Sequence, residues 1–221
     1  SEIYSAAIQD YERGIVIGST TTGKGTAQVQ LDTLAHGQAT LTQRKFYRVT
    51  GGSTQNKGVV PDIKLVDIYN EEFGERKAKN ALKWDTIPTA PFKREGSIQS
   101  YVQNLAQMSQ QRVVADPQFK YLEQRKAIAK KTEEQKRVVL DIDQRKAELN
   151  ALEQKTLESE NQRRAVTGQK PYANWESYQA AMDALIESRS KMKATQRPAL
   201  PEEEVFVTES ANILLDYAKL Q

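Results

Sequence analysis

The first 93 residues alternate short apolar runs with turns rich in glycine, serine and threonine. Between residues 2 and 11, apolar side chains recur three or four positions apart, which predicts one face of a helix. Residues 14–18 hold a continuous apolar run between two glycines, which predicts a short buried strand. Further strands are predicted, from alternating or extended patterns, at residues 27–31, 39–42, 45–49 and 59–63. One helix with several short strands indicates an α/β arrangement.

From about residue 94 onward, the pattern changes to the wider apolar spacing of amphipathic helices. Asp116 followed by a proline, and later Asn174, are typical helix N-caps. Residues 138–140 fit either a short strand or the start of a helix, and Pro198 and Pro201 indicate a linker. Helices are predicted at about residues 98–108, 117–134, 144–164, 175–185 and 208–220.

The apolar stripes of these helices are expected to form a core. In the last two-thirds of the chain they include Leu149, Leu152 and Leu157, and, in the final helix, Ile213, Leu214, Tyr217 and Leu220. Two prolines within residues 86–91 interrupt any regular element. We therefore predict two domains, residues 1–93 and 94–221, and an α+β, mostly α fold in which an α/β part with several short strands precedes a helical domain.

Composition narrows the possible functions. With 221 residues, of which 38% are hydrophobic, the chain is long enough to bury a core. The 32 basic and 29 acidic residues give a net charge of +3, which argues against a nucleic-acid-binding protein. The absence of cysteine excludes disulfides, thiolate metal sites and a cysteine nucleophile. Because no run of about 18 apolar residues occurs, we expect no membrane span. The chain starts without Met and directly in a helix pattern, so we expect a piece of a longer protein.

Several side chains could carry chemistry but have simpler explanations. His36, the only histidine, lies in a turn without the surroundings of a Ser–His–Asp triad, and no second imidazole or thiolate supports metal binding. Basic pairs at residues 125–126, 130–131 and 136–137 favour a solvated helix face, with a docking surface as the alternative. Trp175 and Tyr178 are expected to pack between helices rather than to stack on a ligand.

Residues 18–24 match the G-x-x-x-x-G-K spacing of a nucleotide-binding loop. Such a loop needs Ser or Thr directly after the lysine, where this chain has Gly25. It also needs a following helix, whose N-terminal amides hold the phosphates, and here a strand is predicted instead. The pattern therefore disfavours a nucleotide site, and a glycine-rich turn with a solvated Lys24 is the plain alternative.

Six segments together resemble one known family. They are Ser1-Glu2-Ile3, the Gly-Lys-Gly-Thr-Ala-Gln of residues 23–28, and residues 45–55, 57–63, 80–85 and 212–220. In this order they resemble the carboxy-terminal processing proteases, and within them the tail-specific proteases of bacteria. The resemblance covers both halves of the chain, although the helical middle matches by character more than by residue.

The resemblance implies a serine protease with a Ser–Lys catalytic pair. Lys24 aligns with the general base, Gln28 with the glutamine that orients this lysine, and Asp10 with a supporting aspartate. A lysine can act as a base only when neutral, and burial favours that form. The family's nucleophile aligns two residues before Ser1, and its PDZ domain lies further upstream. We therefore expect the chain on its own to be inactive, and we expect no cofactor and no metal.

The resemblance also implies substrates and a cellular location. The expected function is that of an endopeptidase acting on proteins with apolar C-terminal tails, in the bacterial periplasm or cell envelope, with a possible adaptor protein or homo-oligomer bound through the helical domain. The alternative is a helical partner-binding module without catalysis. The protease hypothesis predicts that Lys24 is buried and points toward the chain start, whereas the module leaves it in solvent.

Overall fold

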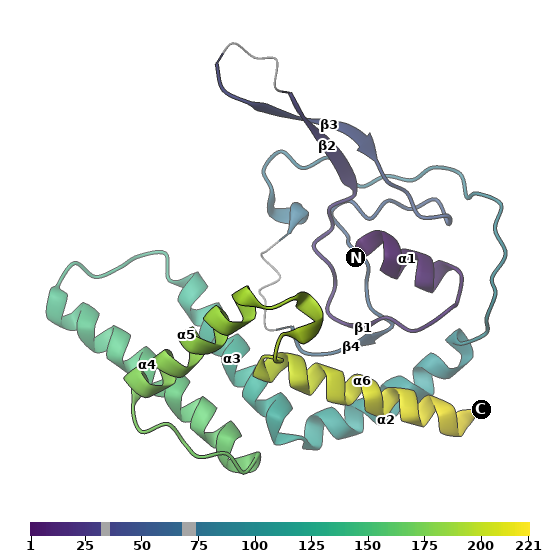
Figure 1. The fold of residues 1–221 in the computed structure, drawn as a ribbon. Coiled ribbons are helices and arrows are strands. Elements are labelled where there is room, and N and C mark those ends of the chain that lie inside the picture. The colour runs from purple at the N-terminus through teal and green to yellow at the C-terminus, as the bar shows by residue number, and fades with distance from the viewer. Residues whose placement is uncertain (32–35, 68–73) are drawn as a thin grey trace. The chain divides into compact units, whose positions relative to one another are not determined.

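A computed structural model describes residues 1–31, 36–67 and 74–221 (Figure 1). In these residues it contains six α-helices and four strands, which confirms the mostly α, α+β fold class. The chain divides into two compact units, Ser1–Met108 with Asp216–Gln221, and Ser109–Leu215. The domain boundary near residue 93 stays a prediction. Within the described ranges, no helix is both long and apolar enough to cross a membrane.

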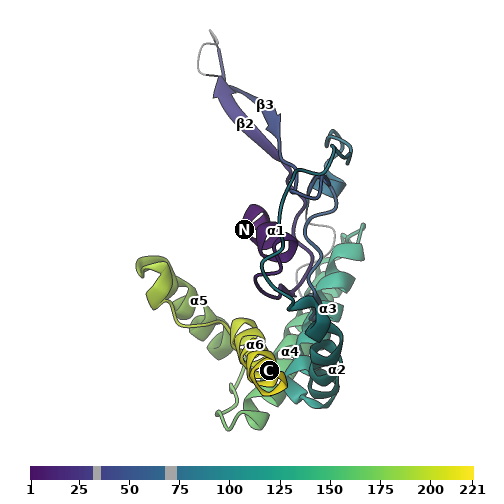
Figure 2. The same ribbon diagram turned by 90° about the vertical axis from the view of Figure 1, so that its right-hand side faces the viewer.

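The first unit begins with helix α1, Glu2–Asp10, where the apolar spacing predicts it. Strand β2, Thr26–Leu31, pairs antiparallel with β3, Ala39–Lys45, and this hairpin extends away from α1 in both views (Figures 1 and 2). Strand β1, Ile17–Gly18, pairs parallel with β4, Ile63–Lys64. The unit also holds the 3₁₀ turn η1, Glu75–Lys77, and the start of α2, Gln99–Ala115.

Three strand predictions need correction. Of the strand expected at residues 59–63, only Ile63 belongs to β4, and residues 59–62 lie outside any strand. The strand expected at residues 14–18 is reduced to the two half-buried residues of β1, because β4 offers only two residues for pairing. The strand expected at residues 45–49 is absent as a separate element. Lys45 is the last residue of β3, and beyond it Tyr47 forms only an isolated bridge with Ser53. The turn at Gly51 then reverses the chain, because the amide of Gly51 donates to Arg48 and that of Arg48 to Gly52.

The second unit is built from helices, of which α3 and α5 start at the predicted caps. It contains α3, Pro117–Glu134, α4, Ile142–Val166, α5, Trp175–Lys191, the 3₁₀ turn η2, Ala194–Gln196, and most of α6, Pro201–Leu220. The carboxylate of Asp116 accepts from the Gln118 amide at 2.8 Å. Asn174 forms a capping box with Ser177. Residues 138–140 adopt neither helix nor strand, and the Leu140 side chain is 98% exposed.

Helix α6 begins earlier than predicted, and the side chains that it buries are only in part the predicted ones. Pro201 is its first residue rather than part of a linker, and three glutamates occupy its first turn, where they complement the helix dipole. Ile213 is buried as expected, but Leu214 is 65% and Leu220 38% exposed. The buried stripe instead follows positions 205, 209, 213 and 216, and it includes two carboxylates.

The apolar stripe predicted on α4 is only partly buried. Leu149 is 53% exposed, and all residues from 141 to 150 are exposed, so the first part of this helix adds nothing to the core. Tyr178 is buried, which confirms its packing role. Trp175 is half-buried and its ring lies 5.1 Å from that of Tyr178 on the same helix, so its packing between helices stays a prediction. Arg125, expected on a solvated face, is half-buried and donates to the Tyr121 hydroxyl at 3.1 Å.

Candidate active site around Lys24

Residues 19–25, here called the lysine loop, connect β1 to β2 and pack their backbone against residues 55–56. Gly23 has φ 81°, and a Cβ there would lie 2.9 Å from the carbonyl carbon of Asn56. A Cβ on Gly25 would lie 2.5 Å from the backbone nitrogen of Gln55. The Asn56 amide also donates to the Gly23 carbonyl at 2.8 Å. Glycine is therefore required on both sides of Lys24, by close backbone contact and, at Gly23, by conformation.

The two amides that flank Lys24 are bound by side chains from distant segments. The Gly23 amide donates to the Glu2 carboxylate at 2.6 Å, and the Gly25 amide donates to Oε1 of Gln55 at 2.8 Å. The Thr21 hydroxyl also donates to Glu2 and accepts from the Val59 amide. The first turn of α1 is thus tied directly to the lysine loop.

The Lys24 ammonium donates to Oε1 of Gln28 at 3.0 Å. Gln28 lies on β2, and its amide nitrogen is 3.4 Å from the hydroxyl of Thr42, its partner in the β2–β3 register. The structure therefore brings Lys24 and Gln28 together, and the bond to Thr42 holds the glutamine amide in the orientation that presents its oxygen to the ammonium.

The prediction that Lys24 is buried is wrong. In the part of the chain that the structure describes, the side chains of Lys24 and Gln28 are both exposed. The loop buries its glycine backbone against residues 55–56, while the Lys24 side chain leaves along the polar face of β2. This exposure matches what the partner-binding alternative expects.

Asp10 lies at the end of α1, is only 7% exposed, and accepts from Nε of Arg48 at 3.0 and 3.1 Å. Nη2 of Arg48 adds a further bond at 2.5 Å. A buried carboxylate needs such pairing, and removing one partner leaves a costly buried charge. The contacts of Asp10 therefore fix the end of α1 to residue 48.

Sequence reasoning missed three residues of this site, Glu2, Arg48 and Gln55. Glu2 and Gln55 stand inside the segments that carry the family resemblance, but their hydrogen bonds join positions 21 and 30 residues apart. The local signal in the sequence is only a glutamine that follows two small hydroxyl residues after the Gly51-Gly52 turn. His36 is exposed in a turn. The lysine loop runs into β2, as predicted, so it lacks the helix N-terminus that a nucleotide site needs.

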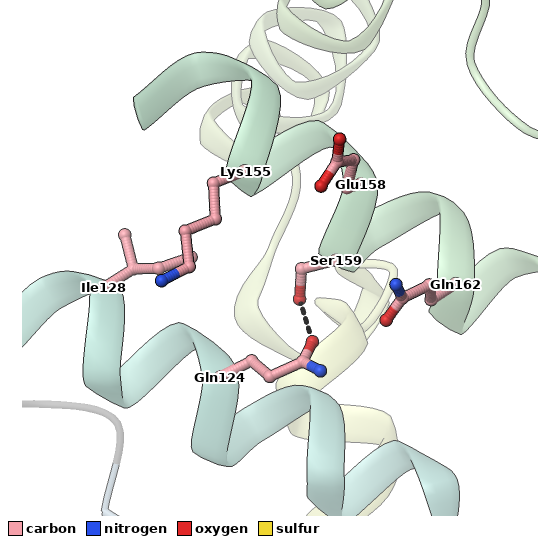
Figure 3. Close-up of a pocket in the computed structure, with 6 residues that line it drawn as sticks. All are labelled: Gln124, Ile128, Lys155, Glu158, Ser159 and Gln162. Carbon is pink, nitrogen blue, oxygen red and sulfur yellow. Dashed lines mark hydrogen bonds between the residues drawn. The ribbon is translucent and has the colours of Figure 1, made fainter. Parts of the chain in front are cut away.

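A separate shallow cavity of about 160 Å³ lies between α3 and α4 in the second unit. Figure 3 shows its lining residues, among them Lys155 and Ser159, which together could suggest a second Ser–Lys pair. The Ser159 hydroxyl instead donates to Gln124 at 2.7 Å, and the Lys155 side chain extends toward Ile128. The cavity therefore holds no activated nucleophile.

Comparisons with known proteins show the family of the chain. Residues 1–65 match the model of peptidase family S41, and residues 68–219 match that of the C-terminal domain of tail specific protease. The chain is 39% identical, over 183 residues, to the tail-specific protease of Haemophilus influenzae, covering 77% of this chain and 26% of that protein. It is 38% identical, over 73 residues, to the carboxy-terminal-processing protease of Bartonella bacilliformis, covering 33% of this chain and 17% of that protein.

The chain thus spans about a quarter or less of the length of these curated relatives. Because the two family models together account for nearly the whole sequence, the chain belongs to the tail-specific protease family, with an S41 peptidase segment followed by the C-terminal domain.

Proposed function

We propose that this chain is the C-terminal part of a serine endopeptidase in which Lys24 is the general base and Gln28 orients it. The observation that carries the proposal is the 3.0 Å hydrogen bond between Lys24 and Gln28, in a loop whose backbone is fixed to the first turn of α1. The resemblance aligns the nucleophile two residues before Ser1, next to the turn of α1 whose Glu2 binds the lysine loop. This proximity in sequence supports the proposal.

In this mechanism a serine hydroxyl attacks the carbonyl carbon of the scissile peptide bond while the neutral Lys24 amine takes the hydroxyl proton. The protonated amine then gives that proton to the departing amine nitrogen, which leaves an acyl-enzyme ester on the serine. Water, deprotonated by Lys24, attacks the ester carbonyl. The protonated amine then returns the proton to the serine oxygen as the new C-terminus leaves. Gln28 holds the amine toward the reacting atoms throughout, and Asp10 with Arg48 supports the helix from which the nucleophile is presented.

The exposure of Lys24 fits this proposal if other parts of the protease cover it. The Haemophilus influenzae relative is about four times as long as the segment matched here, because the match covers 26% of it. Cover from that remainder, or from bound substrate, would remove water from the amine and favour its neutral form. The chain on its own would then be inactive.

The proposed substrates are proteins with apolar C-terminal tails, in the bacterial periplasm or cell envelope. The names of the two relatives, tail-specific and carboxy-terminal-processing, support this choice. The helical domain would serve the protease by binding an adaptor protein or another copy. Neither a cofactor nor nucleic acid takes part in the proposed reaction.

A partner-binding helical module without catalysis is the second candidate. The exposed Lys24 favours it, together with the exposed apolar side chains of α6, Val207, Leu214 and Leu215. The two candidates differ in a simple respect: only the protease needs the amine of Lys24.

Replacement of Lys24 in the full-length parent protein tests the proposal. Cleavage of a folded substrate with an apolar C-terminal tail would be followed by gel and mass spectrometry for Lys24→Ala and for the exposed control Lys93→Ala. Loss of a general base lowers the rate by about two to four orders of magnitude, so we expect such a loss for Lys24→Ala alone. Equal cleavage by Lys24→Ala and the unmodified protein would refute the proposal.

A further inference from the structure

We propose that Gln55 is a positioning residue for Lys24 and that Glu75, from the C-terminal domain segment, holds Gln55 in place. This inference rests on the proposed function, since it assigns the supports of the proposed general base. The three groups form one chain of hydrogen bonds, from the Glu75 carboxylate through the Gln55 side chain to the Gly25 amide.

Gln55 is fully buried, with 0% exposure, and its side-chain amide is bonded at both ends. Oε1 accepts from the Gly25 amide at 2.8 Å, and Nε2 donates to Oε1 of Glu75 at 3.0 Å. Its backbone amide donates to the Ser53 hydroxyl at 3.0 Å. A buried amide with both polar ends satisfied has a single favourable orientation, because a flip would set like groups against each other. Oε1 of Gln55, which accepts from the Gly25 amide, therefore has a fixed position.

Glu75 opens η1, which lies within residues 68–219, the segment matched to the C-terminal domain. Its backbone amide donates to the Thr22 carbonyl at 2.9 Å. The preceding Gly74 packs so closely that a Cβ there would lie 2.6 Å from the same carbonyl oxygen. The turn thus holds the lysine loop on both sides of Lys24, by backbone contact at Thr22 and through Gln55 at Gly25.

These contacts set the direction in which the Lys24 side chain leaves the loop. Without Gln55, the Gly25 amide loses its buried acceptor and the peptide units after Lys24 can rotate. Small displacements of a catalytic group reduce the rate of the chemical step far more than substrate binding. Loss of Gln55 or of Glu75 should therefore lower kcat and leave KM nearly unchanged. The C-terminal domain would in this way contribute to catalysis without touching substrate.

The test uses the full-length protein with four variants: Gln55→Ala, Glu75→Ala, Glu75→Gln and the neighbouring control Arg76→Ala. Measurements are kcat, KM, the rate at which a fluorophosphonate labels the serine nucleophile, and the melting temperature. Because Gln55 is fully buried and its removal endangers folding, the half-buried Glu75 provides the second, safer position.

We expect Gln55→Ala and Glu75→Ala each to lower kcat and the labelling rate by about tenfold, the size of one lost hydrogen bond. KM should stay within about twofold, as for a lost interaction made in the transition state. Glu75→Gln keeps an acceptor for Gln55 and should restore activity, and Arg76→Ala should match the unmodified protein. In the Gln55→Ala background, Glu75→Ala should add little, because Glu75 acts through Gln55.

Three results would overturn the inference: full activity of Glu75→Ala, equal losses in Glu75→Gln and Glu75→Ala, or a loss confined to KM. Its failure is distinguishable from failure of the proposed function by Lys24→Ala, measured beside these variants. If Lys24→Ala is inactive while Glu75→Ala is fully active, the base stands and only its support is disproved. If Lys24→Ala is fully active, both are disproved.

Discussion

Lys24 is held in place chiefly by its backbone. The neighbouring glycines bury their main chain against residues 55–56, and their amides bind Glu2 and Gln55. Among the described residues, the side chain itself donates to Gln28. Substitutions that disturb the backbone of the lysine loop should therefore matter as much as changes to the residues that Lys24 contacts.

Gly25→Ala tests this dependence. An added Cβ would lie 2.5 Å from the Gln55 backbone nitrogen, so the loop must move away from residue 55. In the full-length protein we expect at least about a tenfold loss of cleavage, since one displaced hydrogen bond already has that effect. The control is Gly52→Ala, whose Cβ would meet its nearest atom, on Trp84, at 3.9 Å. Unchanged cleavage by Gly25→Ala would show that the backbone contact is dispensable.

At the level of residues, sequence reasoning found Lys24, Gln28 and Asp10 through the family resemblance. It missed Glu2 and Gln55, which bind the amides on either side of Lys24, and Arg48, which binds Asp10. Each of these contacts joins segments 21 to 38 positions apart. The exposure of Lys24 was also out of reach, since glycine neighbours indicate tight backbone packing but not the direction of the side chain between them.

At the level of elements, caps were easier to predict than strand lengths. Asp116 and Asn174 bond amides two or three residues ahead, so their signals are local. Strand length depends on a partner, and β1 ends where β4 does. The sequence does not predict the early start of α6, because two nearby prolines indicate a linker. Proline is nevertheless well tolerated at the first helical position, which Pro201 occupies.

The helices of the second unit enclose two tyrosines whose ionisation opposes folding. Burial raises the pKa of Tyr121 above its usual value of 10.0, with the Glu160 carboxylate adding to the effect and Arg125 opposing it. Burial likewise raises the pKa of Tyr178. Both hydroxyls keep their protons in the folded protein at a pH where the unfolded chain releases them. Their contribution to stability is present below about pH 10 and is lost as the pH rises further.

We therefore expect the free energy of unfolding to fall above about pH 10, by at most about 1.4 kcal/mol per pH unit for each tyrosine. Urea unfolding of the chain between about pH 8 and 11.5, followed by circular dichroism, measures this slope. Tyr121→Phe should make the slope shallower, whereas Tyr4→Phe should not, because Tyr4 is 71% exposed. Equal slopes for Tyr121→Phe and Tyr4→Phe would contradict the assignment.

At the level of the whole chain, the family matches, the compact units of the structure and the sequence pattern give different domain boundaries. The S41 match ends at residue 65 and the C-terminal domain match begins at 68. The first compact unit, in contrast, continues to Met108 and takes in the last six residues, Asp216–Gln221. Sequence pattern predicts the border near residue 93, where prolines stop regular structure, since contacts such as that of the Glu95 amide with the Tyr11 carbonyl leave no trace in local spacing.

The central claim, that Lys24 acts as a base, is tested most directly by Lys24→Arg in the full-length protein, measured beside Lys24→Ala. Arginine keeps the positive charge and can donate to Gln28, but its guanidinium stays protonated and cannot accept a proton. We predict that Lys24→Arg loses at least about two orders of magnitude in kcat, as Lys24→Ala does. Cleavage by Lys24→Arg at the rate of the unmodified protein would show that Lys24 supplies only charge, and would contradict the account.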